Sequence, residues 1–211
     1  MIQIDLFSDI ICPWCYIGRS RLQKALEARK GLDVSINWRA FQLNPDMPLE
    51  GIPRSQYLAL KFGDKNRAES IYKNIKRAGE LEGLKFNFEK ISHTPNTVLA
   101  HRFITWSKQT GNSEKVVEKL FEAYFVDGLN IGLPEILKDI AVDAKMNTKE
   151  FDAYLESKQG IGEVNSDTKF AYTNGITGVP YFIFNKQFSI TGAQEPTAFL
   201  PLLDIKPELD R

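Results

Sequence analysis

The chain has 211 residues, and its 27 basic and 27 acidic side chains give a formal net charge of zero at neutral pH. This balance gives no electrostatic reason to expect nucleic acid or an anionic membrane surface as a partner. No run of about 18 apolar residues predicts a membrane-spanning helix, and the amino terminus lacks the features of a secretory signal, so we expect a cytoplasmic protein.

The amino-terminal segment predicts a strand, a helix and a second strand. Residues 2–7 alternate apolar and polar side chains, although the apolar residues at both ends indicate burial on both faces. A helix is predicted for residues 13–29, because Gly31 follows as a normal stop signal. Residues 33–41 alternate again and favour a second strand. Two parallel strands joined by a right-handed helical crossover are the expected arrangement.

The middle of the chain is predicted to be a helical block without a convincing strand. It begins with an exposed loop at residues 43–53, where prolines and a glycine prevent regular structure. Residues 84–91 fit either an extended segment or a loop. Helices are predicted at residues 54–62, 65–81, 96–108, 113–125, 134–144 and from 148 to 160 at the latest.

The carboxyl-terminal segment predicts a helix, a hairpin and a final helix. The first helix covers residues 161–174. Residues 178–184 form a strongly apolar strand, and residues 187–191 form its antiparallel partner across an Asn185-Lys186 turn. The last helix begins at Pro196.

This order of elements predicts an α/β protein with a thioredoxin fold and a large all-helical domain inserted after the second strand. We expect the thioredoxin-like domain to comprise residues 1–44 and 160–211, and the inserted helical domain to comprise residues 45–159. A chain of this length can be one domain with a large insertion and can bury a substantial core. The sequence leaves the oligomeric state open.

The only two cysteines, Cys12 and Cys15, lie at the junction between the predicted first strand and the predicted first helix. Unpaired N–H groups and the helix dipole favour a thiolate there, so we expect a lowered pKa and a nucleophilic role for Cys12. Pro13 suits the first helical turn, and helical geometry brings Cys15 beneath Cys12 as the resolving thiol. A disulfide between them closes almost no loop and stabilises the fold little, so a catalytic role is favoured.

The cysteine pair has a second interpretation, as half of a zinc site. A structural zinc ion normally needs four ligands. Only His93 and His101 remain to complete the set, and both lie in the helical block without the usual ligand spacing. We therefore expect no metal.

Several motifs together resemble the DsbA family, and within it the cytoplasmic FrnE-like branch. The main ones are Cys12-Pro13-Trp14-Cys15, the Gly178-Val179-Pro180 step before the hairpin, and the helical insertion between them. The resemblance spans nearly the whole chain. Further matching stretches are residues 38–45, Asn96-Thr97, Ala100-His101-Arg102, residues 122–125 and residues 189–194.

The resemblance implies a cis bond between Val179 and Pro180, in a loop that lies against the cysteine pair. The backbone of Val179 would then pair with an extended substrate chain, and Pro13, Trp14, Val179 and Pro180 would contact substrate. Trp14 has the alternative of filling space around the disulfide, as Tyr16 is expected to do. The implied substrates are protein or small-molecule disulfides or thiols. No bound cofactor is implied besides the redox-active Cys12–Cys15 disulfide.

Three further residues are tentative site residues. Asp9 is the nearest acid to the cysteines, where it either relays the proton of Cys15 or caps a turn. In related glutathione-using enzymes the insertion helps to bind the small substrate, which makes Asn96 and His101 candidates. His101 has the alternative of packing between helices.

The leading functional hypothesis is a thiol–disulfide oxidoreductase that reduces, oxidises or isomerises disulfides through a mixed disulfide. The alternative is a glutathione-dependent enzyme resembling 2-hydroxychromene-2-carboxylate isomerase or kappa-class glutathione transferase. Those relatives generally have serine in place of Cys12 and commonly lack the second cysteine, so two thiols favour redox chemistry, with glutathione as a candidate co-substrate. A third hypothesis is a non-catalytic zinc-binding or partner-binding domain.

Overall fold

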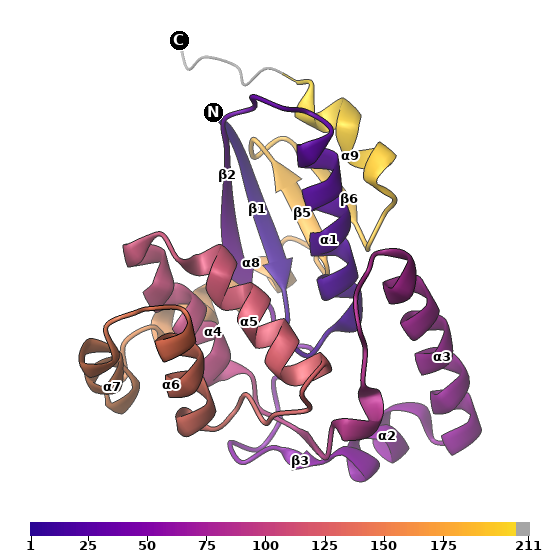
Figure 1. Ribbon diagram of the computed structural model, residues 1–211, viewed down its shortest axis with the longest axis vertical. Coiled ribbons are helices and arrows are strands. Elements are labelled where there is room, and N and C mark those ends of the chain that lie inside the picture. Colours follow the sequence, from indigo (N-terminus) through magenta and orange to yellow (C-terminus); the bar gives the residue numbers. More distant parts are fainter. Residues whose placement is uncertain (206–211) are drawn as a thin grey trace.

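The computed structural model describes residues 1–205 (Figure 1). A four-stranded mixed sheet with the order β2-β1-β5-β6 lies at the centre of the protein. Strands β1 (Ile2–Ser8) and β2 (Val34–Ala40) are parallel and are joined by helix α1 (Pro13–Glu27). Strand β5 (Tyr181–Phe184) runs antiparallel to β1, and β6 (Phe188–Thr191) runs antiparallel to β5. The predicted thioredoxin fold is confirmed.

The remaining helices follow the predicted positions closely and are α2 (Arg54–Phe62), α3 (Lys65–Leu81), α4 (Val98–Ser107), α5 (Ser113–Phe125), α6 (Pro134–Asp143), α7 (Thr148–Glu156), α8 (Ile161–Thr173) and α9 (Pro196–Leu203). The inserted segment lies beyond the carboxyl ends of β1 and β2, with α4 to α7 on one side and α2 and α3 on the other (Figure 1). Within residues 1–205, no helix combines the length and apolar character needed to cross a membrane.

Helices cover both faces of the sheet, which explains why β1 is apolar on both sides (Figure 1). Ile4 belongs to the same buried cluster as Phe199 of α9. Phe7 belongs to a second cluster on the other face, with Ala171 of α8. Burying a side chain of this size contributes about 1.5–3 kcal/mol. The strand that leads into the cysteine pair is therefore held from both sides.

A short strand pair shows that the prediction of a strand-free helical block is wrong. Strand β3 (Ile52–Pro53) pairs antiparallel with β4 (His93–Thr94). Gly51 has a φ of +73°, and a Cβ added there would lie 2.5 Å from the Thr94 carbonyl oxygen. Only glycine allows this close approach of two backbones. Alternation of side chains does not reveal strands of two residues, so the sequence pattern missed the pair.

Other predicted boundaries shift for local reasons. The ambiguous residues 84–91 contain a single 3-10 turn, Phe88–Lys90. The apolar stretch at residues 178–184 becomes a strand only at Tyr181, because the residues before it form the loop beside the cysteines. The division into domains at residues 45 and 159 stays a prediction, since side chains from both segments share one buried cluster. The last six residues of the predicted carboxyl-terminal segment lie outside the described residues.

Arg102 of α4 ties two helices of the insertion together. Its side chain is 4% exposed, and its guanidinium donates to the carbonyl oxygens of Tyr154 (2.8 Å), Ser157 (2.7 Å) and Gln159 (2.7 Å). These carbonyls lie at the carboxyl end of α7, where the helix dipole is negative and a cation is stabilising. Arg102 is therefore the cap of α7.

Candidate active site

The two cysteines lie at the carboxyl end of β1 and the amino end of α1. Cys12 is the residue before the helix, with extended backbone angles, and Pro13 is the first helical residue. The Cys15 N–H donates to the Cys12 carbonyl oxygen at 3.0 Å, which places Cys15 one turn further along. Both are free thiols, Cys12 being 5% and Cys15 1% exposed. Cys12 is thus the more exposed of the two residues.

The two thiols have pKa values that are shifted in opposite directions. The hydrogen bond from the Cys15 side chain lowers the pKa of Cys12, and backbone N–H groups of the first turn add to this against the opposing effects of burial and of Asp9. Burial raises the pKa of Cys15 well above its ordinary value, and the neighbouring Cys12 raises it further. Cys12 therefore ionises first, while Cys15 keeps its proton.

The loop before β5 completes the site. The bond between Val179 and Pro180 is cis, as the resemblance implied. The Cys12 thiol donates to the Val179 carbonyl oxygen at 3.6 Å, across 167 residues of sequence. Gly18 of α1 lets the loop approach, because a Cβ there would lie 2.8 Å from Cγ of Pro180. The site thus unites two segments that are far apart in sequence.

This arrangement agrees with the comparison to known proteins. A family model described as a DSBA-like thioredoxin domain matches residues 3–204. The chain belongs to this family. The crystal structure of a probable DsbA oxidoreductase from Streptomyces coelicolor is 30% identical, with a TM-score of 0.87, and the match covers 96% of this chain and 88% of that chain.

Two more distant solved structures share the fold. The cytosolic disulfide reductase DsbM from Pseudomonas aeruginosa, solved with GSH, is 15% identical with a TM-score of 0.66, and the match covers 96% of this chain and 94% of that chain. A 2-hydroxychromene-2-carboxylate isomerase is 19% identical with a TM-score of 0.69, covering 96% of this chain and 92% of that chain. At these identities the likeness shows the common architecture and no more.

In this DsbA-like site, replacing Cys15 with alanine is expected to raise the pKa of Cys12, because the largest cause that lowers it is the Cys15 hydrogen bond. The thiolate fraction of Cys12 falls as pH drops through its pKa. The pH profile of iodoacetamide alkylation should therefore move to higher pH in Cys15→Ala, as followed by mass spectrometry. An unchanged profile would mean that the backbone N–H groups alone stabilise the thiolate.

The close packing of Gly18 against the Pro180 loop gives a second prediction. Gly18→Ala should separate α1 from the loop and lower kcat/KM for disulfide exchange, with an overpacking cost of about 1–3 kcal/mol that exceeds the gain of about 1 kcal/mol in helix propensity. Gly162→Ala in α8 is the matched control, because its added Cβ meets no atom within 4 Å. Equal effects of the two substitutions on activity would contradict the role of the contact.

The aromatic residues of the DsbA-like motif differ in exposure. Trp14 is 40% exposed beside Cys12. Tyr16 is buried and stacks on Phe121 at a centroid distance of 4.9 Å and on Phe125 at 6.1 Å. Tyr16 therefore joins α1 to α5, whereas Trp14 is available for contact with another molecule.

Asp9 and His101 lie together behind the cysteine turn. Asp9 is fully buried, and its carboxylate accepts from the backbone N–H groups of Leu43 (2.8 Å) and Ile11 (3.5 Å). His101 Nε2 lies 3.5 Å from Asp9 Oδ1 and 3.1 Å from the Phe41 carbonyl oxygen. These bonds cap the turn before Cys12 and fasten α4 to the end of β2. The structure thus gives both residues positioning contacts.

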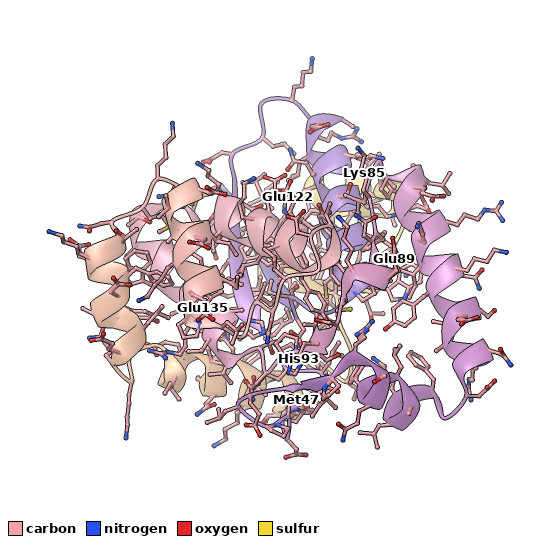
Figure 2. The ribbon with its side chains drawn as sticks, turned by 60° about the horizontal axis from the view of Figure 1, so that its bottom comes forward. Met47, Lys85, Glu89, His93, Glu122 and Glu135 are labelled. Carbon is pink, nitrogen blue, oxygen red and sulfur yellow. The ribbon has the colours of Figure 1, made fainter. Side chains whose placement is uncertain are left out.

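The third candidate, Asn96, links the start of α4 to the loop at residues 43–48. Its Nδ2 donates to the Met47 carbonyl oxygen at 2.7 Å, and its Oδ1 accepts from the Val98 N–H at the start of α4. Met47 and His93 are both labelled in Figure 2, on the side of the protein that faces the viewer, and His93 Nε2 is 2.9 Å from the Glu50 carbonyl oxygen. In the part of the chain that the structure describes, no cluster of three or more His, Cys, Asp or Glu side chains suits a metal ion.

A cavity of about 700 Å³, which the sequence analysis did not predict, lies between the loop at residues 43–48 and one face of α2. Lys61 lines it, and its Nζ donates to the Tyr57 hydroxyl at 2.7 Å. Burial acts to lower the pKa of Lys61, but Tyr57, Tyr72 and the negative charge of Cys12 raise it overall. The ammonium group of Lys61 therefore stays charged at neutral pH. Tyr57 and Lys61 are four residues apart, which places them on the same face of a helix. This spacing is the sequence signal that could have indicated their contact.

Proposed function

We propose that this protein is a thiol–disulfide oxidoreductase in which Cys12 is the nucleophile and Cys15 the resolving thiol. The observation that carries the proposal is the opposite shift of the two pKa values in a pair whose outer sulfur faces the Val179 carbonyl. The lowered pKa of Cys12 supplies the thiolate that attacks the substrate. Cys15 is buried and protonated, so it attacks the mixed disulfide only after that disulfide has formed.

The reaction has two steps. The Cys12 thiolate attacks one sulfur of a substrate disulfide, and the other substrate sulfur leaves as a thiolate. Cys15 then loses its proton and attacks Cys12, which releases the second substrate thiolate and leaves a Cys12–Cys15 disulfide. Two electrons pass from the cysteine pair to the substrate. The same steps in reverse oxidise a substrate dithiol.

Substrate contact is assigned to four residues around Cys12. We expect the backbone of Val179, beside Pro180, to pair with an extended chain, as in other modes of strand addition. Pro13 and the exposed ring of Trp14 form the other side. Backbone pairing gives affinity for many sequences, so the proposed substrates are diverse protein or small-molecule disulfides.

The proposed direction is reduction or isomerisation in the cytoplasm. The DsbM relative is described as a cytosolic disulfide reductase and was solved with GSH, which makes glutathione the proposed electron donor. The reduction potential of cytosolic glutathione is about −250 mV or below. It keeps the cysteine pair reduced unless the reduction potential of the pair is lower than that of glutathione. Assignment to the FrnE-like branch remains a prediction from the sequence motifs.

A second candidate function is a glutathione-dependent isomerase or transferase. The cavity beside the site favours it, because Lys61 presents an ammonium group without a carboxylate partner among the described side chains, and glutathione carries two carboxylates. In that case Cys12 would occupy the position where those relatives have serine, and a serine there should still support the reaction. Retention of both cysteines favours the redox function.

Trapping of the intermediate tests the proposal. Reduced Cys15→Ser protein mixed with oxidised glutathione should form one mixed disulfide at Cys12, visible by mass spectrometry, whereas Cys12→Ser should form none. Isomerase or transferase activity that survives in Cys12→Ser would instead favour the second candidate. Redox titration of the wild-type pair against glutathione then fixes the direction of electron flow.

A further inference from the structure

A second cavity, of about 570 Å³, lies on the opposite face of α2 from the one near the cysteines. Leu58 and Ala59 of α2, Ala68 of α3 and Phe88 form most of its apolar wall. Its volume lies within the range of sites that hold small organic ligands. The redox reaction proposed above does not use this cavity.

Arg54, the first residue of α2, brings a buried positive charge to this cavity. Its side chain is 8% exposed. The guanidinium donates to the Tyr72 hydroxyl at 2.6 Å, to Thr94 Oγ1 at 3.3 Å and to the Tyr124 hydroxyl at 3.5 Å. Burial raises the pKa of both tyrosines, so these acceptors are neutral at physiological pH. No carboxylate lies within ion-pair distance of Arg54 among the side chains that the structure describes.

Buried charges in proteins are nearly always paired, and the contrast with Arg102 shows what Arg54 lacks. Arg102 also pairs with no carboxylate of the described side chains, but it faces the carbonyl oxygens at the negative end of α7. Arg54 lies at the positive end of α2, where a cation is unfavourable. The residue before α2, Pro53, gives no side-chain cap to the first turn. The guanidinium of Arg54 and the positive end of the α2 dipole therefore lie beside the same apolar cavity.

A purely structural role for Arg54 accounts for only part of this arrangement. The guanidinium joins α3, β4 and α5 through its hydroxyl partners, and it lies 5.2 Å from the ring centre of Tyr57 and 5.0 Å from that of Tyr72. Ring faces attract a cation, but they supply no negative charge. The hydrogen bonds of Arg54 to the hydroxyl groups of Tyr72, Thr94 and Tyr124 all use Nη1 and Nη2, and none of these acceptors is charged.

We infer that this cavity binds a small organic anion with one negative charge and an apolar chain. The carboxylate of the ligand pairs with Arg54, and the chain lies along Leu58, Ala59 and Phe88. Glu69 and Glu89 line the cavity as exposed side chains, and Figure 2 shows Glu89 beside α3. A second negative charge on the ligand would face the carboxylate of Glu89, so the site selects monoanions over dianions.

Calorimetric titration of the full chain with octanoate tests the inference. We expect binding of one octanoate per chain, with weaker binding of the dianion octanedioate and none of octyltrimethylammonium. Arg54→Gln should weaken octanoate binding by about tenfold or more, because it removes a charge-assisted hydrogen bond. Absence of octanoate binding, or equal binding of the cationic analogue, would overturn the inference.

A second variant keeps the test informative if Arg54→Gln fails to fold. Ala59 is exposed at the cavity wall, so Ala59→Trp should fill the cavity, abolish octanoate binding and leave Arg54 in place. Leu81→Trp is the matched control, because Leu81 is 74% exposed at the end of α3 and lines neither cavity of α2. Octanoate binding that persists in Ala59→Trp would place the ligand elsewhere and contradict the inference.

Discussion

Replacing Cys12 with serine is expected to reduce disulfide-exchange turnover by about a thousandfold or more, because a serine hydroxyl stays protonated near neutral pH and is a far weaker nucleophile than a thiolate. Cys12 is the sulfur with the lowered pKa and with the Val179 carbonyl beside it. Insulin reduction with glutathione as electron donor measures the effect. The substitution nearly preserves side-chain volume, so the fold should survive.

Two variants serve as controls for this result. Gln23→Ser places the same residue type on the exposed face of α1, where Gln23 bonds only to Glu27 among the described side chains, and its activity should match the wild type. Cys15→Ser should keep the first step and lose the second, so it accumulates mixed disulfide and turns over slowly. Turnover that is equal in Cys12→Ser and the wild type would remove the cysteine pair from the mechanism.

Replacing Arg102 with methionine is expected to lower the free energy of unfolding by about 3–5 kcal/mol, because several carbonyl oxygens lose their partner while remaining buried. The carbonyls of Tyr154, Ser157 and Gln159 all accept from this one guanidinium. Methionine fills a similar volume, so the loss reports mainly on hydrogen bonds and charge. The midpoint of urea unfolding measures it.

The matched control for Arg102→Met is Arg77→Met on the exposed surface of α3, which should change the unfolding midpoint little. Near-ultraviolet circular dichroism should show whether Trp106, which packs against Tyr154 in the same region, changes its surroundings. A change of less than about 1 kcal/mol in Arg102→Met would mean that water replaces the guanidinium and that the cap is dispensable.

The parts of the site that depend on local chemistry could be predicted from the sequence. The place of Cys12 just before the first helix, with Pro13 as the first helical residue, followed from the local sequence, and the structure agrees. The order in which Cys12 and Cys15 react stays a prediction. The proximity of Val179 had no local signal, because 167 residues separate it from Cys12. Only the family resemblance supplied it, and the structure agrees.

Features that depend on packing between elements could not be predicted in this way. Arg54 is an ordinary basic residue in the sequence, and its burial arises because α3, β4 and α5 converge on the start of α2. The β3–β4 pair has two residues in each strand, and it depends on the positive φ of Gly51. Asp9 and His101 were separate candidates in the sequence, and only the folded insertion brings them together.

The long-range contacts of the cysteine turn also determine when the reactive centre comes into existence. Leu43, His101 and Val179 contact the residues of the cysteine turn. All three are synthesised after both cysteines, in that order. At about 5–20 residues per second, the nascent chain carries Cys12 and Cys15 for on the order of ten seconds or more before Val179 is made. During this interval the thiols lack the enclosure that separates their pKa values. An unfinished chain thus lacks the contacts that enclose the two thiols, and the proposed redox reaction requires a chain whose synthesis is almost complete.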